Sequence, residues 1–352
     1  MRVAAVVVAW NSATDLPACL AALQAQDHPD LEVVVVDNAS VDGTAGLLDA
    51  ELAAARRHPL RVVTNRTNRG FCGGVNDAVA MLAPAVQAVL LVNPDVVAAP
   101  DLVRRCVAAL VADPRRGSIQ PKLHRTVATR DGGRVIDTTG HVLTAARLVA
   151  NRGEGEVDRG QFDVAGEVFG ASGALVLHRR EMLDAVAWQH PDGRREHLTE
   201  DLVAYFDDVE LDWRARLHGW TAWYEPAATG VHERGGAGPR RTANVEALNW
   251  ANRLLVVATC DDRRSLLRAA PLVAATTLLK SVELAITVPR AVPAAVGRLR
   301  ALPRALRRRR QLLARATRTT GAVADRWVEP FRWRPWVTTW WRRTTRRPAG
   351  AT

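Results

Sequence analysis

The sequence predicts an α/β fold, in which a mostly parallel sheet is flanked by helices and followed by a C-terminal helical region. Short apolar runs of the kind that are buried on both faces recur in the first hundred residues, at positions 3–9, 31–36, 60–64 and 88–92. Leucines at helical spacing separate these runs, as at Leu16, Leu20 and Leu23. Strands that alternate with helices over such short connections predict parallel neighbours and right-handed crossovers.

The boundaries of the later elements follow from turn and cap signals. Ser12 and Ser40 stand where N-caps of the first two helices are expected. Residues 130–165 contain several glycines and are interpreted as an irregular insert. A strand at 174–178, a helix at 180–186 and a mostly helical stretch at 245–288 follow. We therefore divide the chain into a main domain (1–240), a helical extension (241–288) and a tail (289–352).

The positive charge of the chain is concentrated in the tail. From residue 289 on there are 17 Arg against Asp325 and Glu329, a net charge of +15, whereas the whole chain carries +11. The first 288 residues are therefore slightly acidic, with a net charge of −4. Nucleic-acid binding by the main domain would need a basic surface, so this charge distribution argues against it.

The cysteine spacing and the N-terminal sequence indicate in which cellular compartment the protein resides. The 4 Cys residues are isolated, and none has the spacing of a zinc or redox pair. This pattern indicates a reducing compartment without a disulfide framework. The N-terminal apolar run ends at Trp10, which is short for a signal peptide, so we interpret it as the first strand and expect a cytoplasmic protein.

Polar residues follow all four predicted strands of the first hundred residues. They are Asn11, Asp37-Asn38, Asn65 and Asn93-Pro94-Asp95. Ligands of open α/β sheets bind beyond the carboxyl ends of the strands, so these residues predict a binding site at one sheet edge. The alternative for each residue alone is that it caps the next helix.

Asp95 and His232 are candidate metal ligands. A carboxylate at a strand end with few basic neighbours suits a hard divalent cation that bridges diphosphate oxygens. The alternative is that Asn-Pro-Asp is an ordinary turn. His232 follows a predicted strand at 229–231 and lies downstream of an acidic segment, although a lone histidine is more often structural.

Acidic side chains crowd the segment 205–214, whose sequence is Tyr-Phe-Asp-Asp-Val-Glu-Leu-Asp-Trp-Arg. A helix dipole favours acidic residues in its first turn, which is the simpler explanation. With Glu200 and Asp201 included, however, so many carboxylates repel one another unless cations or substrate hydroxyls lie between them. Such crowding raises the pKa of at least one group, as a general base requires.

Taken together, these segments resemble the family 2 inverting glycosyltransferases of GT-A fold, a Rossmann-like fold, and especially the bacterial rhamnosyltransferase-like group. The ordered motifs cover about residues 1–235. They are Val-Ala-Trp-Asn-Ser at 8–12, Val-Val-Asp-Asn-Ala-Ser-Val-Asp-Gly at 35–43, Asn-Arg-Gly-Phe at 68–71, Leu-Val-Asn-Pro-Asp at 91–95, Phe-Gly-Ala at 169–171, and the segment 206–214 followed by Gly219-Trp220 and His232.

The resemblance implies a nucleotide-sugar donor, which would be a dTDP- or UDP-sugar, with rhamnose as the suggested sugar. Asp37 would contact the nucleobase or ribose, and the backbone near Ala9 and the side chain of Asn11 would frame that pocket. The remaining donor-site positions would be Asn38, Asn93 and the loop over the nucleotide formed by Asn68, Arg69 and Gly70.

The resemblance also implies the catalytic machinery. Asp95 would hold Mg²⁺ or Mn²⁺ on the diphosphate, with His232 as a second protein ligand, and the metal would neutralise charge on the leaving nucleoside diphosphate. Asp208, next to Asp207, would be the base that deprotonates the acceptor hydroxyl, so the configuration would invert. The acceptor would be a lipid-linked or cell-envelope glycan, such as a polyprenyl-linked one.

Three segments depart from the usual family pattern. The common Asp-x-Asp is Asn-Pro-Asp at 93–95, as in the rhamnosyltransferase-like group, so metal binding rests on fewer carboxylates. The common Glu-Asp-x-Asp is Asp-Asp-Val-Glu at 207–210. A polar loop at 188–198 replaces an aromatic, glycine-rich stretch, which makes the acceptor the least transferable part of the resemblance.

The tail interleaves tryptophan with arginine, a composition that attracts proteins to an anionic bilayer at about 1 kcal/mol per basic residue near the surface. The alternatives are a disordered basic tail and an RNA-binding arm. No membrane-spanning helix is predicted, because the longest uncharged run between Ser265 and Pro289, at 269–279, is far short of the roughly 20 residues required. We therefore expect a peripheral protein on the inner face of the plasma membrane. The residues are Trp327, Trp333, Trp336, Trp340 and Trp341 with Arg332, Arg334, Arg342, Arg343, Arg346 and Arg347.

Two other classes of function compete with a glycosyltransferase. A dinucleotide-dependent oxidoreductase would need a Gly-x-Gly-x-x-Gly turn after the first strand, and residues 9–12 contain no glycine. A catalytically silent nucleotide-binding or scaffold protein, recruited by the tail, would bind nucleotide but would not depend on Asp208.

Overall fold

The computed structural model of the chain describes residues 1–129, 132–233 and 242–345. The chain forms two compact units. The first consists of Met1–Val142 and Ala150–Gly238, and the second of Leu143–Val149 and Pro239–Thr352. Residue 240, where the sequence suggested the end of the main domain, lies outside the described residues.

A ten-stranded sheet forms the first unit, with the order β10-β14-β6-β11-β4-β1-β2-β3, while β5 pairs with β14 and β7 with β6. The strands β4, β1, β2 and β3 are mutually parallel neighbours, and β11 is antiparallel to β4 and β6. The strands are β1 (Val3–Ala9), β2 (Leu31–Asp37), β3 (Leu60–Thr64), β4 (Ala88–Val92), β5 (Val96–Ala98), β6 (Arg116–Arg125), β7 (Ile136–Thr138), β10 (Gly166–Val168), β11 (Leu175–Arg179) and β14 (Thr221–His232).

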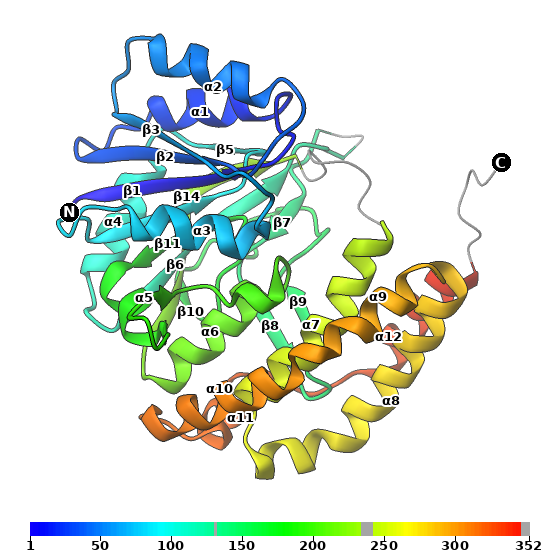
Figure 1. The fold of residues 1–352 in the computed structure, drawn as a ribbon. Coiled ribbons are helices and arrows are strands. Elements are labelled where there is room, and N and C mark those ends of the chain that lie inside the picture. The colour runs from blue at the N-terminus through cyan, green and yellow to red at the C-terminus, as the bar shows by residue number, and fades with distance from the viewer. Residues whose placement is uncertain (130–131, 234–241, 346–352) are drawn as a thin grey trace. The chain divides into compact units, whose positions relative to one another are not determined.

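Helices cover both faces of this sheet: α1 and α2 lie on one side of β1–β3, and α3 lies on the other (Figure 1). Helix α3 and strand β1 pack closely at Gly74, where an added Cβ would lie 2.7 Å from Val8 Cγ1. The helices of the unit are α1 (Leu16–Gln24), α2 (Thr44–Ala53), α3 (Gly70–Ala80), α4 (Leu102–Val111), α5 (Arg180–Val186) and α6 (Asp207–Leu217), with a 3-10 turn at Glu200–Leu202. A small hairpin is formed by β12 (Trp188–Gln189) and β13 (Arg195–Glu196).

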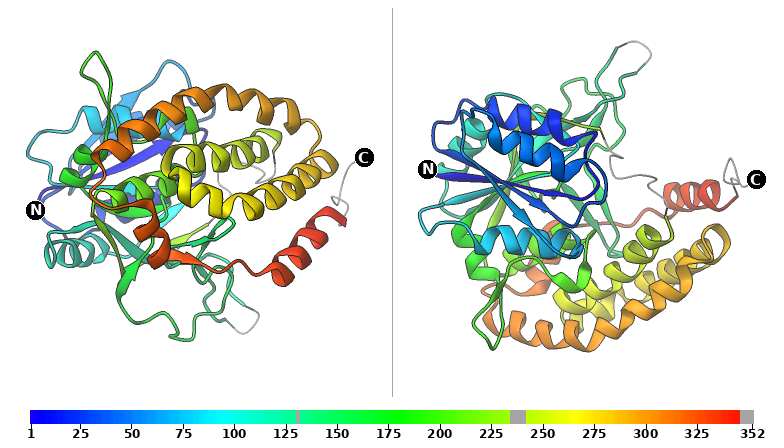
Figure 2. Two further views of the ribbon diagram at one scale, coloured as in Figure 1. Left: turned by 90° about the horizontal axis from the view of Figure 1, so that it is seen from below. Right: turned by 45° about the horizontal axis from the view of Figure 1, so that its top comes forward.

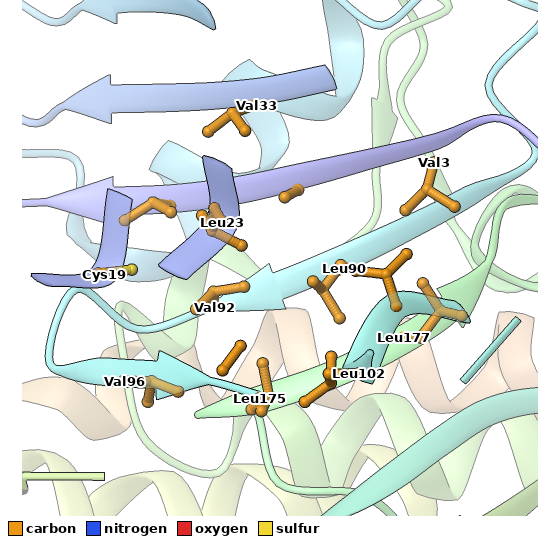
Figure 3. Close-up of a cluster of buried hydrophobic side chains, with 14 of the residues drawn as sticks. Val3, Cys19, Leu23, Val33, Leu90, Val92, Val96, Leu102, Leu175 and Leu177 are labelled. Carbon is orange, nitrogen blue, oxygen red and sulfur yellow. The ribbon is translucent and has the colours of Figure 1, made fainter. Parts of the chain in front are cut away.

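The core of the first unit lies between the sheet and helices α1 and α4. Val3, Leu90 and Leu177 from three strands share it with Leu23 of α1 and Leu102 of α4 (Figure 3). Fully burying such a side chain contributes roughly 1.5–3 kcal/mol. The strands at the centre are buried on both faces, which is why they appear in the sequence as continuous apolar runs.

The second unit is mainly helical, and α7, α8 and the α9–α10 stretch lie side by side (Figure 2). Its helices are α7 (Ala243–Cys260), α8 (Arg263–Thr287), α9 (Ala291–Arg298), α10 (Leu302–Arg315), α11 (Thr320–Trp327) and α12 (Trp333–Thr345), with a 3-10 turn at Leu299–Ala301. The short strand β15 (Val328–Glu329) pairs with Leu143 and Thr144 of β8 (His141–Thr144), which is followed by β9 (Val149–Asn151). A buried ion pair joins Arg147 Nε to Asp261 Oδ2 at 2.8 Å.

The tail is structured over most of its length. Its described residues contain four helices, α9 to α12, so a wholly disordered tail does not describe this chain. Arg346 and Arg347 of the tryptophan–arginine segment lie outside the described residues.

Helix α8 bears on the expectation that no helix spans a membrane. Within the described part of the chain it is the one helix whose length and apolar composition would allow it to cross a bilayer, and 28% of its most apolar window is buried. Core helices of other proteins meet the same criterion, so this feature alone does not identify a membrane span. The expectation is therefore not confirmed.

Candidate functional site

The ends of β1 and β2 form the first part of the site. Ala9 and Asp37 are register partners in the parallel pair, and the N–H of Asn38 donates to the carbonyl of Ala9 at 2.8 Å. Asp37 is only 3% exposed, and its Oδ1 accepts a hydrogen bond from the backbone N–H of Ser40 at 3.0 Å. The Asp37 side chain thus braces the turn that leaves β2.

Asn11 joins the loops that follow the two strands. It adopts a left-handed backbone conformation, with φ of 51°. Its Oδ1 accepts from the N–H of Val41 at 2.8 Å, and its own N–H donates to Ser40 Oγ at 2.9 Å. This bracing fixes the loop geometry around the predicted nucleobase pocket.

The side chain of Asn38 forms hydrogen bonds with each residue of the predicted nucleotide loop. Its Nδ2 donates to Asn68 Oδ1 at 3.0 Å and to the carbonyl of Gly70 at 2.9 Å, while its Oδ1 accepts from the N–H of Arg69 at 3.0 Å. The structure therefore brings all three predicted loop residues onto one buried amide at the end of β2.

Gly70 brings this loop against the segment that precedes the acidic pair. Its φ is +70°, and an added Cβ would lie 2.5 Å from Val203 Cγ1, so a side chain does not fit. The N–H of Cys72 donates to the carbonyl of Val203 at 3.0 Å. Arg69 forms ion pairs with Asp77 and, at 3.4 Å, with Glu200.

The backbone just before the acidic pair is strained. Val203, Tyr205 and Phe206 all have left-handed φ, at 67°, 67° and 64°. Such conformations cost of order 1–3 kcal/mol each in bulky residues, and they persist where the surrounding structure imposes them. Helix α6 begins directly after this turn, so the turn sets the direction of Asp207 and Asp208.

Asp207 and Asp208 have different environments. Asp207 is buried, and burial together with the charge of Asp208 raises the pKa of Asp207 to about 8. The Asp208 side chain keeps 24% of its surface exposed. Of the two, Asp208 is the carboxylate that a substrate hydroxyl can reach.

Asp208 is fastened to the segment that leads into β11. Its Oδ2 accepts from the backbone N–H of Gly173 at 3.0 Å, and its Oδ1 accepts from the N–H of Val209 at 2.8 Å. The adjacent Ala174 accepts, through its carbonyl, the N–H of Asn93 at 2.9 Å. Asp208 is therefore connected through Gly173–Ala174 to the end of β4, where Asn93 leads to Asp95.

Asp95 and His232 are brought together, as the sequence predicts for a pair of ligands. His232 Nε2 lies 3.3 Å from Asp95 Oδ1, and His232 Nδ1 lies 2.8 Å from Asp137 Oδ2. Burial alone would lower the pKa of His232, but the hydrogen bonds and charges of Asp137 and Asp95 outweigh it and raise the pKa to about 9. The N–H of Val96 donates to the carbonyl of Asn93 at 3.1 Å, so Asn-Pro-Asp is a turn, and this turn carries Asp95.

Further carboxylates lie near Asp95. Burial first, and then the charges of Asp95 and Glu233, raise the pKa of Asp15. The Oδ2 atom of Asp15 is buried and makes no hydrogen bond within the residues that the structure describes. Repulsion between carboxylates and a buried unsatisfied oxygen both favour a cation there. The described residues contain no cluster of three or more His, Cys, Asp or Glu arranged around a single ion position.

The polar residues at the strand ends do not act as helix caps. The N-caps of α1, α2, α3 and α4 are Asp15, Gly43, Arg69 and Asp101, and none of them makes a side-chain cap hydrogen bond. None of the polar residues that directly follow the four strands caps a helix. Ser12 and Ser40, which the sequence suggested as N-caps, instead accept hydrogen bonds from Trp10 and Asn11.

The crowding of acidic residues is partly relieved within the protein. Glu210 Oε2 pairs with Arg214 Nε at 2.9 Å, and both side chains are buried. Glu200 Oε1 pairs with Arg194 Nη1 at 2.7 Å. These carboxylates need no substrate or metal for neutralisation, which leaves Asp207, Asp208 and Asp212 as the close-set acidic group of α6.

The sequence did not single out His141, which lies in the presumed irregular insert. Its Nδ1 lies 2.9 Å from Asp212 Oδ2, and its Nε2 lies 3.5 Å from Asp208 Oδ2. The motif Phe-Gly-Ala at 169–171 packs against the same group, because the N–H of Ala171 donates to Asp212 Oδ2 at 2.9 Å. No sequence pattern near His141 predicts this contact, because His141 is brought to α6 only by the tertiary fold.

Known proteins resemble this chain in sequence. The family described as "Glycosyltransferase like family 2" matches residues 1–253. N-acetylglucosaminyl-diphospho-decaprenol L-rhamnosyltransferase of Mycobacterium tuberculosis is 26% identical over 290 residues, which cover 76% of this chain and 86% of that protein.

Solved structures resemble the fold. GalNAc-T7 with UDP, GalNAc and Mn²⁺ has a TM-score of 0.62 and 12% identity over 93% of this chain, which spans about half (56%) of that one. TarS 1–349 of S. aureus in complex with UDP-GlcNAc has a TM-score of 0.53 and 17% identity, over 90% of this chain and 84% of that one. The mannosyltransferase PcManGT of Pyrobaculum calidifontis, in complex with GDP-Man and Mn²⁺, has a TM-score of 0.50 and 21% identity, over 93% of this chain and 87% of that one.

The family match extends over more than half of the chain and includes every predicted site residue. The structural neighbours share the mostly parallel sheet flanked by helices that carries these residues. The chain belongs to glycosyltransferase family 2, and it is a glycosyltransferase with the GT-A fold.

Proposed function

We propose that the chain is an inverting glycosyltransferase that moves a sugar from a nucleoside-diphosphate donor to a lipid-linked or cell-envelope glycan, with Asp208 as the general base. The observation that carries this proposal is the linkage of Asp208, through Gly173 and Ala174, to Asn93 at the end of β4. That linkage ties the proposed base to the sheet edge that carries Asp37 and Asp95.

Asp208 meets the chemical requirements of the base. Its side chain is partly exposed, whereas its neighbour Asp207 is buried, and burial together with the charge of Asp208 raises the pKa of Asp207 to about 8. In the transfer, the acceptor oxygen bonds to the anomeric carbon as the bond from that carbon to the diphosphate oxygen breaks. The acceptor proton goes to Asp208, and the nucleoside diphosphate leaves.

The donor would lie along the ends of β1, β2 and β4. Asp37, Asn11 and Ala9 line the turn that follows the first two strands, and Asn38 orders the loop of Asn68, Arg69 and Gly70. Asn93 completes this edge. The relative from Mycobacterium tuberculosis is named a rhamnosyltransferase, which favours a rhamnose donor, as a dTDP- or UDP-sugar.

Asp95 and His232 fit a divalent cation, Mg²⁺ or Mn²⁺. Both offer ligand atoms of the right kind, and Asp137 holds the second nitrogen of His232, as partners of metal-bound histidines commonly do. His232 would bind as the neutral imidazole, so the cation would displace the proton from Nε2. The unsatisfied Asp15 oxygen adds negative potential nearby. A cation bound there would act as a Lewis acid that neutralises charge on the diphosphate. Two of the solved neighbours were determined with Mn²⁺.

The acceptor is assigned from the relative's name, which specifies an N-acetylglucosaminyl-diphospho-decaprenol substrate. We extend this to a polyprenyl-linked acceptor for the present chain. Such an acceptor is presented at a membrane, so the proposal includes a peripheral location on the cytoplasmic face of the plasma membrane.

Two exposed apolar stripes in the second unit support the membrane contact. On α8, Leu278 and Ile286 are 66% and 59% exposed, with Val282 between them at helical spacing. On α12, Trp333, Val337 and Trp341 are exposed at the same spacing. The two helices pack together, because Trp340 Nε1 donates to the carbonyl of Leu279 at 3.0 Å.

Charge favours an anionic bilayer as the partner of these stripes. The tail supplies a net charge of +15, and helix α10 carries the run 307–310 of four arginines. Exposed tryptophan and leucine together with arginine suit the interfacial region of a membrane.

The alternative raised by the sequence, a catalytically silent nucleotide-binding or scaffold protein, is disfavoured by the match to glycosyltransferase family 2. A direct test measures rhamnosyl transfer from dTDP-rhamnose to decaprenyl-diphospho-N-acetylglucosamine, with Mn²⁺ present and with Mn²⁺ chelated. The proposal expects transfer with inversion that requires the metal. Nucleotide binding without transfer to any acceptor of this class would favour the silent alternative.

A further inference from the structure

His141 occupies a buried position between two carboxylates of α6, and its role rests on the proposed function of Asp208. The ring reaches Asp212 through Nδ1 at 2.9 Å and faces Asp208 through Nε2 at 3.5 Å. The side chain is 4% exposed, so solvent does not supply its partners. The imidazole therefore bridges a carboxylate of the interior and the one proposed to meet substrate.

Backbone contacts with Gly170 and Ala171 hold both residues of the bridge, His141 and Asp212, in place. The N–H of His141 donates to the carbonyl of Gly170 at 3.0 Å. The residue that follows Gly170 is Ala171, and its N–H donates to Asp212 Oδ2. Asp212 packs so closely on Gly170 that an added Cβ would lie 1.8 Å from Oδ2. The glycine of the Phe-Gly-Ala motif is thus required by the contact that holds Asp212 on His141.

The groups of the bridge have shifted pKa values. Burial raises the pKa of Asp212 to about 6, with the hydrogen bond from His141 opposing a larger rise. Burial would lower the pKa of His141, but the charge of Asp208, the hydrogen bond to Asp212 and the charge of Asp207 outweigh it and raise the pKa. These three carboxylates, all on α6, are the charged groups that face the ring.

We propose that His141 is a positioning residue for Asp208. Asp212 fixes the ring through Nδ1, so the Nε2–H group points at Asp208 and holds that carboxylate, together with the N–H of Gly173, in the orientation that receives the acceptor proton. Burial alone would lower the pKa of His141, and the charge of Asp208 raises it, so the ring and the proposed base attract each other. No proton passes to His141 in this scheme, because the proton taken from the acceptor stays on Asp208 until it is released to solvent.

The test uses the full-length enzyme with dTDP-rhamnose and decaprenyl-diphospho-N-acetylglucosamine. In His141→Gln and in Asp212→Asn, kcat is expected to fall about ten- to hundred-fold, which is less than the roughly 10²- to 10⁴-fold contribution of a general base itself. The donor KM should stay within about twofold, and the acidic limb of the kcat/KM profile should move to higher pH. The effects of the two changes should be non-additive in the double variant, because the residues act as one unit.

The matched control is His124→Gln. His124 is also a buried histidine on a carboxylate, but it lies in β6, and within the described residues its side chain pairs with Asp158, with Nε2 2.7 Å from Oδ2, and not with a residue of α6. Its variant should keep the pH profile of the wild type even if its melting temperature falls. Equal pH profiles and kcat values for His141→Gln and the wild type would overturn the positioning role.

A second measurement separates this proposal from the proposed function. The ring C–H resonances of His141 are followed by NMR across pH in the wild type and in Asp212→Asn. The titration midpoint should be above that of a free imidazole and should drop in the variant. An unchanged midpoint would overturn the bridge, whereas absence of transfer by the wild type, with the midpoint behaving as expected, would overturn the proposed function alone.

Discussion

The backbone N–H of Gly173 lies 3.0 Å from Oδ2 of Asp208 and anchors the first turn of α6 to the sheet. The residue after Gly173 bonds to Asn93, two positions before Asp95. Two acidic residues that are 113 positions apart in the sequence are therefore joined by one short path of hydrogen bonds. This path is the physical basis for the proposal that Asp208, as the base, and Asp95, as a cation ligand, belong to one site.

Replacing Gly170 by alanine should destabilise the first unit. The new Cβ would collide with the Asp212 carboxylate, and such overpacking costs typically about 1–3 kcal/mol. Gly166→Ala is the control, because nothing lies within 4 Å of its added Cβ. Thermal unfolding should show a clear loss of melting temperature for Gly170→Ala only. Equal melting temperatures would mean that Asp212 does not pack where the structure has it.

Asp207→Asn should stabilise the protein more at pH 8 than at pH 5. The folded-state pKa of Asp207 is raised to about 8 from an ordinary value near 4, so its contribution to the free energy of unfolding decreases as pH rises through this range. The decrease amounts to at most about 1.4 kcal/mol per pH unit, and asparagine avoids it. Melting curves at the two pH values measure the difference. Asp49→Asn, at an exposed position of α2, is the control and is measured at the same two pH values.

Asp95→Asn and Asp137→Asn should both weaken Mn²⁺ binding. Asp95 is a proposed ligand, and Asp137 orients the other proposed ligand, His232. Loss of the residue that orients a metal-bound histidine lowers metal affinity about 10- to 100-fold at comparable sites. Electron paramagnetic resonance titration of Mn²⁺ with nucleoside diphosphate present measures the affinity without turnover. Asp113→Asn, in an exposed turn beside Arg115, serves as the control. Wild-type affinity in Asp95→Asn would remove Asp95 from the cation site.

The joint variant Leu278→Ser, Ile286→Ser and Trp341→Ser should bind membranes less. These side chains are the most exposed members of the two apolar stripes. Flotation with vesicles that contain phosphatidylglycerol should recover several-fold less of this variant than of the wild type.

Substitutions are preferable to deletion of the tail, because its helices pack within the second unit. Val41→Ser with Val164→Ser is the control for the membrane experiment, since both valines are exposed in the first unit, at 89% and 81%. Recovery that is equal for the wild type and the joint variant would exclude the stripes as the membrane contact.

The sequence predicted the parallel part of the sheet closely. Three of the first four strands have the predicted bounds, and β2 extends one residue further, to Asp37. Strands buried on both faces need apolar residues at every position, so they leave a strong and short signal. The polar residues that follow them could be assigned to one sheet edge for the same reason, because parallel strands end together.

The sequence could not predict the contacts that complete the site. Residues 130–165 were interpreted as irregular, although they contain β7, β8 and β9 and supply Asp137 and His141. Arg130 itself lies outside the described residues. Helix α6 buries Glu210, Asp212 and Arg214, so its pattern lacks an apolar stripe that would have revealed which side faces inward. Pairing between distant charged residues is a property of the tertiary fold and leaves no local periodicity.

The helix starts were also misplaced. Ser12 and Ser40 were expected as N-caps, but α1 and α2 begin after Asp15 and Gly43. The hydroxyl of Ser40 instead accepts the N–H of Asn11, which braces one loop of the donor side against the next. A serine between a strand and a helix can satisfy either role, and sequence alone does not distinguish them.

The central claim is that Asp208 removes the acceptor proton. The decisive measurement compares kcat and donor affinity in Asp208→Asn with those of the wild type, with Asp49→Asn as a control. The account predicts that kcat falls about 10²- to 10⁴-fold while donor affinity changes less than about twofold, because a general base acts on the transition state and not on donor binding. Wild-type turnover in Asp208→Asn would contradict it.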